Sequence, residues 1–323
     1  MLSDVLFPDI VGGAGRVAYH LGLELSKKGH DVHILTRNTD GGLPSHQQLL
    51  PNLTAHRFFV PRKESLGLFF SEIKNSLILA GQMAKKTAFD IVCIHQSMVA
   101  IGPLLSGCFN NIPIIYYYHS PWHEEFLVKK RTGNNKSGGR GRVIARIMRL
   151  VEKRILRKAS KVIVLSQYMA NKLSEIHNIP ADRVVKIPGG VDLNRFHLPD
   201  EGKEAAKLRL SLSQHKTIFL TVRNLVPRMG LENLIEAFSR SDILKENGLL
   251  LIGGQGFLEN HLRSKVDDLN LKESIRLLGH IPDDDLPGTY QAADFFVLPT
   301  RELEGFGLVI LEAMACGIRT CDT

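Results

Sequence analysis

The sequence has few of the features that mark secreted, membrane-spanning or zinc-finger proteins. Its four cysteines, Cys93, Cys108, Cys316 and Cys321, show no C-x-x-C spacing, which argues against a disulfide framework or a cysteine zinc site and indicates reduced thiols in the cytosol. The longest apolar runs, such as residues 112–118, have strand length and fall far short of the ~20 residues that span a bilayer. No basic segment precedes an apolar stretch at the N-terminus, so a signal peptide is not expected.

Acidic residues are nearly absent from one long basic segment, residues 129–158, where only Glu152 opposes the positive charge. The chain as a whole has a formal charge of +8. Such a segment favours a polyanionic partner: a phosphorylated substrate, a nucleic acid or an anionic membrane surface. It also lacks the interleaved aromatic residues that stack on bases, which argues against nucleic acid. The basic residues are Lys129, Lys130, Arg131, Lys136, Arg140, Arg142, Arg146, Arg149, Lys153, Arg154, Arg157 and Lys158.

What the sequence does contain is a regular alternation of short apolar strands with amphipathic helices. The strands are apolar throughout, as expected for parallel strands covered on both faces. The alternation therefore predicts an α/β architecture with parallel sheets. Strands are predicted at residues 32–36, 91–94, 112–118, 162–165, 218–222, 249–252 and 295–298, and helices at 15–28, 231–241, 286–293 and 307–315.

A Gly- and Pro-rich stretch at residues 187–200 divides the 323 residues into two predicted domains, 1–190 and 200–323. Residues 132–141 form a second, Gly-, Asn- and Ser-rich segment that predicts a loop. Both ends look incomplete, because little chain precedes Gly12 to form a first strand and the sequence stops soon after Ile318. We therefore expect a C-terminal sheet of only three or four strands, with an uncovered edge.

Two segments of the first domain contain candidate functional residues. Gly13 and Gly15 lie in a glycine-rich turn before a helix, where a backbone can approach an anion closely, although such turns are also common for structural reasons. His119 follows an apolar strand, and ligands of open α/β sheets bind at that strand end. A histidine there is also often a purely structural residue.

The second domain contains further candidates. Arg223 and Arg228 follow its first strand and could clamp a diphosphate, or could be two solvated loop residues. Gly254 lies in another glycine-rich turn between strand and helix. Glu304 and Glu312 bracket a Gly-Phe-Gly turn at the start of a helix, an arrangement that suits a sugar and a diphosphate. The structural alternative is a capped amphipathic helix with a surface acid.

Taken in order, these motifs resemble glycosyltransferase family 4 over essentially the whole chain. The most specific is the Glu-x7-Glu spacing of Glu304 and Glu312, within Glu-Gly-Phe-Gly and Glu-Ala-Met-Ala-Cys-Gly. The resemblance implies a GT-B fold: two Rossmann-like domains, the first holding the acceptor and the second most of a nucleotide-sugar donor. It also implies transfer that retains the anomeric configuration, without a metal or other cofactor.

The resemblance also assigns roles to single residues. Glu304 would contact the hydroxyl groups of the donor sugar, Glu312 would bind the ribose, and backbone N–H groups near Phe306, Gly307 and Leu308 would meet the sugar or phosphate. His119 would lie near the reacting sugar. Arg223 and Arg228 would stabilise the leaving diphosphate, and the donor site would further include Gly13, Gly15 and Gly254.

The loop before Gly230 departs from the family pattern, and Arg223 and Arg228 are each one position off the commonest alignment. The family usually has an arginine and a lysine in the loop before Gly230, and Met229 stands where the lysine is expected. The sequence therefore leaves two main hypotheses open. The first is a hexosyltransferase that acts on a sugar or lipid-linked acceptor, and the second is a truncated, inactive fragment that at most binds nucleotide. A sugar-nucleotide epimerase of the same fold is a further alternative, against which the Glu-x7-Glu block argues.

The basic residues between 142 and 157 recur every three to four positions, with apolar residues such as Ile147 and Leu150 between them. One hypothesis is a cytoplasmic enzyme that docks peripherally on an anionic membrane to reach its acceptor. The other, which the sequence alone favours, is a helix packed on its sheet with a solvated basic face.

Overall fold

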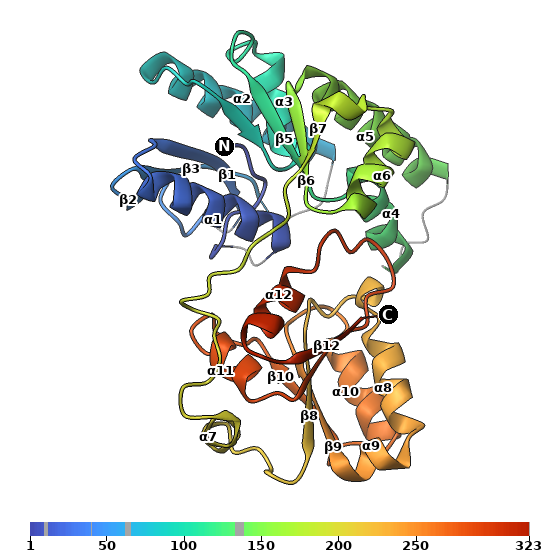
Figure 1. Ribbon diagram of the computed structural model, residues 1–323. Helices are drawn as coiled ribbons and strands as arrows, with labels where there is room; N and C mark the ends of the chain where they lie inside the picture. Colours follow the sequence, from blue (N-terminus) through green and yellow to red (C-terminus); the bar gives the residue numbers. More distant parts are fainter. Residues whose placement is uncertain (10–11, 40, 62–65, 133–138, 323) are drawn as a thin grey trace. The chain divides into compact units, whose positions relative to one another are not determined.

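The computed structural model describes residues 1–9, 12–39, 41–61, 66–132 and 139–322 (Figure 1). Contacts divide the chain into an N-terminal unit, Met1–Pro188, and a C-terminal unit, Gly189–Thr323. Each unit is built on a mainly parallel sheet with helical crossovers, so the predicted α/β fold of two Rossmann-like domains is confirmed. Among the described residues, no helix is long and apolar enough to cross a membrane. Most of the loop predicted at residues 132–141 lies outside the described residues.

The N-terminal unit contains two strand ladders that share one sheet. The first has the order β1-β3-β2 and the second β4-β5-β6-β7. Its strands are β1 (Val32–Asn38), β2 (His46–Leu50), β3 (Leu53–Phe59), β4 (Val92–Ile94), β5 (Ile114–Tyr118), β6 (Lys161–Val164) and β7 (Val184–Lys186). Its helices are α1 (Gly13–Lys27), α2 (Leu66–Lys86), α3 (Ser97–Leu105), α4 (Trp122–Thr132), α5 (Gly139–Lys158), α6 (Gln167–His177) and the 3-10 turn η1 (Ala181–Arg183).

Leu2 joins these two ladders. It forms parallel bridges with Leu35 of β1 and with Ile94 of β4. Its N–H donates to the Cys93 carbonyl at 2.8 Å, and its own carbonyl accepts from the N–H of His95 at 2.8 Å. The little chain before Gly12 therefore supplies the centre of the sheet. One pairing differs from the predicted parallel arrangement, because β2 runs antiparallel to β3.

The C-terminal unit is a five-stranded parallel sheet of order β10-β9-β8-β11-β12. Its strands are β8 (Thr217–Val222), β9 (Gly248–Gly253), β10 (Ile275–Gly279), β11 (Phe295–Leu298) and β12 (Arg319–Asp322). Its helices are α7 (Lys203–Arg209), the 3-10 turn η2 (Pro227–Met229), α8 (Leu231–Ser239), α9 (Asp242–Asn247), α10 (Glu259–Asp268), α11 (Leu286–Gln291) and α12 (Leu308–Ala315).

Two hydrophobic cores cover the two faces of this second sheet. Along β9, Leu249 and Leu251 belong to one core, which includes residues of α7, α11 and α12. Leu250 and Ile252 belong to the other, which includes residues of α8 and α10. This alternation is the two-residue period of a strand buried on both sides. The expectation of only three or four strands was wrong, since β10 and β12 complete five.

Candidate functional site

The loops after β8 and β9 meet at the carboxyl ends of the C-terminal strands. β8 leads directly into Arg223, and β9 leads into Gly254. Gly254 has a φ of +127°, and a Cβ atom there would lie 1.8 Å from the carbonyl oxygen of Arg223. Only glycine permits this approach, so Gly254 sets the position of the loop beside Arg223. Its part in donor binding remains a prediction.

The predicted residues Arg223 and Glu304 form an ion pair at this strand end. The Arg223 guanidinium also donates to Thr300 Oγ1 at 3.0 Å, and Thr300 Oγ1 donates to Glu304 Oε2 at 3.2 Å. The Arg223 side chain is 8% exposed, whereas that of Glu304 is 30% exposed. The three side chains therefore form one polar cluster in which the carboxylate keeps an accessible edge.

Met229 lies against the same guanidinium. Its Sδ atom accepts from Arg223 Nη2 at 2.9 Å, and its side chain is buried. Burial lowers the pKa of the Arg223 guanidinium, and the Glu304 carboxylate opposes that shift, so the side chain stays a cation. The position at which the family resemblance places a lysine thus holds an uncharged thioether packed on a buried arginine.

Arg228 holds the loop between β11 and α12. Its Nη1 donates to the carbonyl of Leu303 at 3.3 Å, next to Glu304 in the chain. Leu303 has a φ of +60°, in the left-handed region that residues with a Cβ rarely adopt. Backbone strain of this kind is concentrated at ligand-binding loops. The loop that presents Glu304 is therefore held in a conformation that it would not adopt by itself.

Glu312 lies on α12 and is only 8% exposed. The hydroxyl of Tyr290 donates to its Oε2 at 2.8 Å, which partly compensates the burial of the carboxylate. Gly307 caps the start of α12 with a φ of +73°. Phe306 and Leu308 pack their side chains against Gly189, within 3 Å of where a Cβ of residue 189 would lie. Contacts from residues 306–308 to a ligand would therefore come from backbone N–H groups at the helix N-terminus.

His119 follows β5 in the N-terminal unit and lies beside a second histidine. Its Nε2 is 3.3 Å from Nδ1 of His95, and the His95 ring stacks on Tyr117 at 4.5 Å. Burial lowers the pKa of His119 to about 4, and burial also lowers the pKa of His95. Both imidazoles are therefore neutral at pH 7, so each can offer one donor and one acceptor nitrogen.

Gly13 and Gly15 of the first loop differ in how closely they pack against neighbouring atoms. Gly15 packs closely, because a Cβ atom there would lie 3.1 Å from the carbonyl oxygen of Val5. Gly13 begins α1 and is exposed, and a Cβ atom there would meet nothing within 4 Å. Packing therefore explains Gly15 but leaves the glycine at position 13 without a structural reason.

Three neighbours of the predicted residues were missed. His95 directly follows β4, and the strand-end position that identified His119 would also have identified His95. Thr300 follows β11 by two residues, so the same argument applies to it. Tyr290 lies inside the short helix α11 among apolar residues, and no pattern distinguishes it from an ordinary core aromatic.

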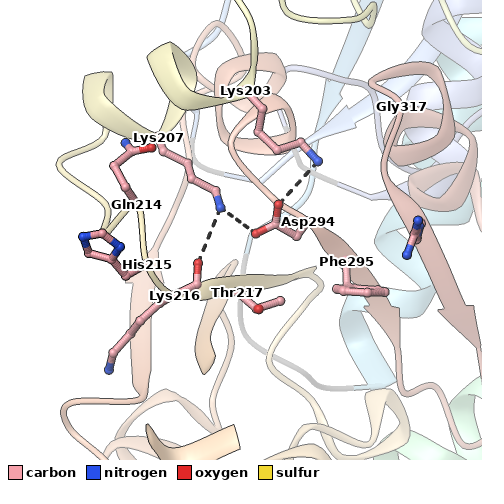
Figure 2. Close-up of a pocket in the computed structure, with 10 residues that line it drawn as sticks. Lys203, Lys207, Gln214, His215, Lys216, Thr217, Asp294, Phe295 and Gly317 are labelled. Carbon is pink, nitrogen blue, oxygen red and sulfur yellow. Dashed lines mark hydrogen bonds and ion pairs between the residues drawn. The ribbon is translucent and has the colours of Figure 1, made fainter. Parts of the chain in front are cut away.

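A separate pocket of about 580 Å³ lies at the opposite, amino ends of β8, β11 and β12 and contains none of the predicted residues. Figure 2 shows Lys203 and Lys207 pointing to Asp294, at 3.5 and 2.7 Å. Asp294 also accepts from the N–H of Ile218 at 2.8 Å. This pocket therefore contains an ion-pair junction that ties α7 to the sheet.

The buried environment of His119 leads to a prediction about its protonation. We expect its imidazole to titrate near pH 4, well below the pKa of 6.5 of an ordinary histidine, because burial disfavours the charged form. The unfolded chain takes up this proton near pH 6.5, so His119 lowers folding stability as the pH falls from 6.5 to 4, and its contribution is fully present above 6.5. An NMR titration of the His119 ring proton, assigned with His119→Asn, measures this directly. A midpoint near 6.5 in the folded protein would contradict it.

The chain matches two glycosyltransferase families. Residues 11–195, more than half of the chain, match "Glycosyltransferase Family 4", and residues 203–320 match "Glycosyl transferases group 1". A GDP-mannose-dependent monoacylated alpha-(1-6)-phosphatidylinositol monomannoside mannosyltransferase of Corynebacterium glutamicum is 34% identical over 139 residues. That match covers 41% of this chain and 36% of the relative.

Two solved structures share the fold over nearly the whole chain. Sucrose-phosphate synthase from Thermosynechococcus elongatus has a TM-score of 0.80 at 25% identity and covers 97% of this chain, which spans 76% of that protein. An Anabaena protein solved in complex with UDP-glucose has a TM-score of 0.67 at 18% identity, covering 99% of this chain and 79% of that one.

Proposed function

The chain belongs to glycosyltransferase family 4, and we propose that it is a hexosyltransferase. It would move a hexose from a nucleotide diphosphate sugar to a sugar or lipid-linked acceptor. The C-terminal unit would bind the donor and the N-terminal unit the acceptor. The transfer would retain the anomeric configuration and would not depend on a divalent metal.

The cluster of Arg223, Glu304 and Thr300 is the observation that supports this proposal most. As the glycosyl bond breaks, negative charge develops on the leaving nucleoside diphosphate. A cation that is buried and already oriented by two hydrogen-bond partners stabilises that charge without further reorganisation. Arg223 meets this description, and Arg228 belongs to the same loop system. These arginines would supply the compensation that a metal supplies in other transferases.

The remaining donor contacts follow from the same strand ends. The accessible edge of Glu304 would bind hydroxyl groups of the sugar. The N-terminal N–H groups of α12, after Gly307, would face the phosphate or sugar, and Glu312 would accept from the ribose hydroxyls. In the N-terminal unit, neutral His119 would exchange hydrogen bonds with the reacting sugar. The open position at Gly13 would let a diphosphate or acceptor approach the start of α1.

The experiment that tests the proposal is a thermal-shift screen against UDP, GDP, ADP and their sugar conjugates, followed by a transfer assay with the conjugate that binds. A ligand that binds only the folded state raises the midpoint. We expect one nucleotide to stabilise the chain and its sugar conjugate to be consumed at a rate that added Mg²⁺ or Mn²⁺ does not change. Absence of any stabilising nucleotide would contradict a donor site.

Met229 supports a second candidate, a protein that binds nucleotide without transferring sugar. The buried thioether removes one cation from the loop, which weakens stabilisation of the leaving group more than it weakens nucleotide binding. The two candidates differ in turnover: both predict a thermal shift with nucleotide, and only the first predicts consumption of the sugar conjugate.

Helix α5 favours a lipid-linked acceptor at an anionic surface. Its packed face is Gly141, Ala145, Met148, Glu152 and Ile155. The only acid of the basic segment therefore points inward, and the outer face has no described carboxylate to offset its arginines. That outer face also exposes an apolar stripe, with Val143 54%, Ile147 53% and Leu150 57% exposed. The sequence had favoured a merely solvated basic face, and the exposed apolar stripe instead supports peripheral membrane docking of a cytoplasmic protein.

We expect the variant Val143→Ser/Ile147→Ser/Leu150→Ser to bind vesicles rich in anionic lipid at least about tenfold more weakly than the parent, because partition scales with the apolar area inserted. Vesicle co-sedimentation at low salt measures this. Ile243→Ser, at a residue of the C-terminal unit that is 74% exposed, is the matched control and should bind like the parent. Equal binding by the triple variant, or no binding by the parent, would remove the membrane hypothesis.

A further inference from the structure

Three helices of the N-terminal unit bring two histidines and a glutamate to one point. His123 lies in the first turn of α4, Glu152 in α5, and His177 is the last residue of α6. One ligand atom from each lies within 4.8 Å of the other two. Glu152 and His177 are fully buried, and His123 is half-buried. Of the three side chains, His123 is therefore the one that solvent reaches.

Hydrogen bonding among the described residues satisfies this cluster only in part. Glu152 accepts from the backbone N–H of Trp122 at 3.3 Å and from the Tyr116 hydroxyl at 3.5 Å, and it pairs with His177 Nε2 at 3.0 Å. His123 Nδ1, His177 Nδ1 and the Tyr118 hydroxyl are buried and have no hydrogen-bond partner in the described part of the chain. Such atoms are costly to bury. An ordinary Glu–His pair accounts for two of the three residues and leaves His123 and Tyr118 unexplained.

We propose that His123, Glu152 and His177 bind a divalent transition metal, zinc or an ion with the same ligand preference. Two imidazoles and one carboxylate are the protein ligands of a common class of three-ligand zinc site, in which water is the fourth ligand. The 3.0 Å between Glu152 Oε2 and His177 Nε2 is close to the roughly 3.3 Å that separates two ligands of a tetrahedral ion at bond lengths of ~2.0–2.1 Å.

A metal at this site would fix the positions of three helices relative to one another. α4 begins three residues after His119, so an ion shared by α4, α5 and α6 would fix the segment that follows β5. The metal would hold these helices together and would involve none of the arginines of the C-terminal unit. The proposal therefore does not depend on the proposed transfer reaction, and its test uses binding rather than turnover.

The test is calorimetric titration of the full chain with ZnCl₂ after chelator treatment, with Co²⁺ as a spectroscopic probe. We expect one equivalent of zinc to bind the wild type, with visible Co²⁺ bands of a tetrahedral nitrogen and oxygen site and no thiolate charge-transfer band. His123→Ala should weaken binding at least tenfold, and zinc should raise the melting midpoint of the wild type but not of this variant. Glu152→Gln, checked for folding by circular dichroism, should also weaken zinc binding at least tenfold and show no rise of the melting midpoint with zinc.

Two controls separate this site from other histidines. His261→Ala removes a histidine from an exposed pair with Glu232 at 2.8 Å and should leave zinc binding unchanged. His56 lies between two other histidines, with ring nitrogens 2.8 Å from His33 and 3.4 Å from His46. His56→Ala should also leave zinc binding unchanged. The proposal is overturned if the wild type binds no zinc, if His123→Ala binds like the wild type, or if His56→Ala abolishes binding.

Discussion

Replacing Arg223 by alanine is expected to lower kcat for sugar transfer by about 100- to 1000-fold, the usual loss when one preorganised donor is removed from a transition-state charge. Arg223 is buried, and Glu304 and Thr300 orient it. Because the charge that it would stabilise appears mainly as the glycosyl bond breaks, KM for the donor should change much less than kcat. Steady-state kinetics with the nucleotide sugar found in the thermal-shift screen measures both parameters.

Two further variants make this result specific. Arg240→Ala removes an arginine that is 80% exposed and forms a surface ion pair with Glu236 one turn away, so its kinetics should match the parent. Arg223→Lys keeps the charge but loses the planar fork, and should recover only part of the loss. An Arg223→Ala enzyme with near-parental kcat would show that the buried cation does not serve the reaction and would favour a structural role for the ion pair with Glu304.

The second large effect is expected at Glu312, where alanine should weaken nucleotide binding by about 10- to 100-fold. A carboxylate that accepts hydrogen bonds from ribose hydroxyls makes charge-assisted bonds, each contributing about 1.5–3 kcal/mol, and tenfold in affinity corresponds to about 1.4 kcal/mol. Calorimetric titration with the nucleoside diphosphate measures the loss. Glu312→Gln keeps the side-chain volume and should fall between the parent and Glu312→Ala.

Tyr290→Phe is the matched control for Glu312, because it removes the hydroxyl that donates to the carboxylate and leaves the carboxylate in place. We expect this variant to lose some stability and to bind nucleotide within a few-fold of the parent. If Tyr290→Phe weakens binding as much as Glu312→Ala does, the carboxylate acts by holding α11 and α12 together, and the ribose contact is wrong.

The buried parallel strands could be predicted from the sequence, and the strands with polar faces could not. β11 was predicted at the residues that form it, because Phe295–Leu298 is apolar throughout. β3 was missed, since His56 and Arg57 interrupt its apolar pattern. Arg57 is nonetheless buried, and its Nε pairs at 2.7 Å with Asp9, which lies near the N-terminus and outside β3. A contact between residues 48 positions apart leaves no local pattern.

In the candidate site too, local motifs could be predicted from the sequence and contacts between distant residues could not. Glycines at strand ends and the Glu-x7-Glu block predicted a ligand site at the carboxyl ends of the C-terminal strands, and the structure places Arg223, Gly254 and Glu304 there. The sequence could not show that Arg223 and Glu304 form an ion pair with each other, because 81 residues separate them. Nor could it choose the packed face of α5, where small residues such as Ala145 and the buried Glu152 face inward while Ile147 faces water.

The short bridge at Leu2 has a consequence for how the N-terminal sheet assembles. The ladders on either side of it can each form from strands close in sequence, whereas Leu2 must find Ile94, more than ninety residues away, before the two halves share hydrogen bonds. Closing this long loop costs more entropy than closing the shorter loops within each ladder. We therefore expect the ladders to join after each has formed, and amides of residues 2 and 95 to exchange with solvent as one cooperative unit.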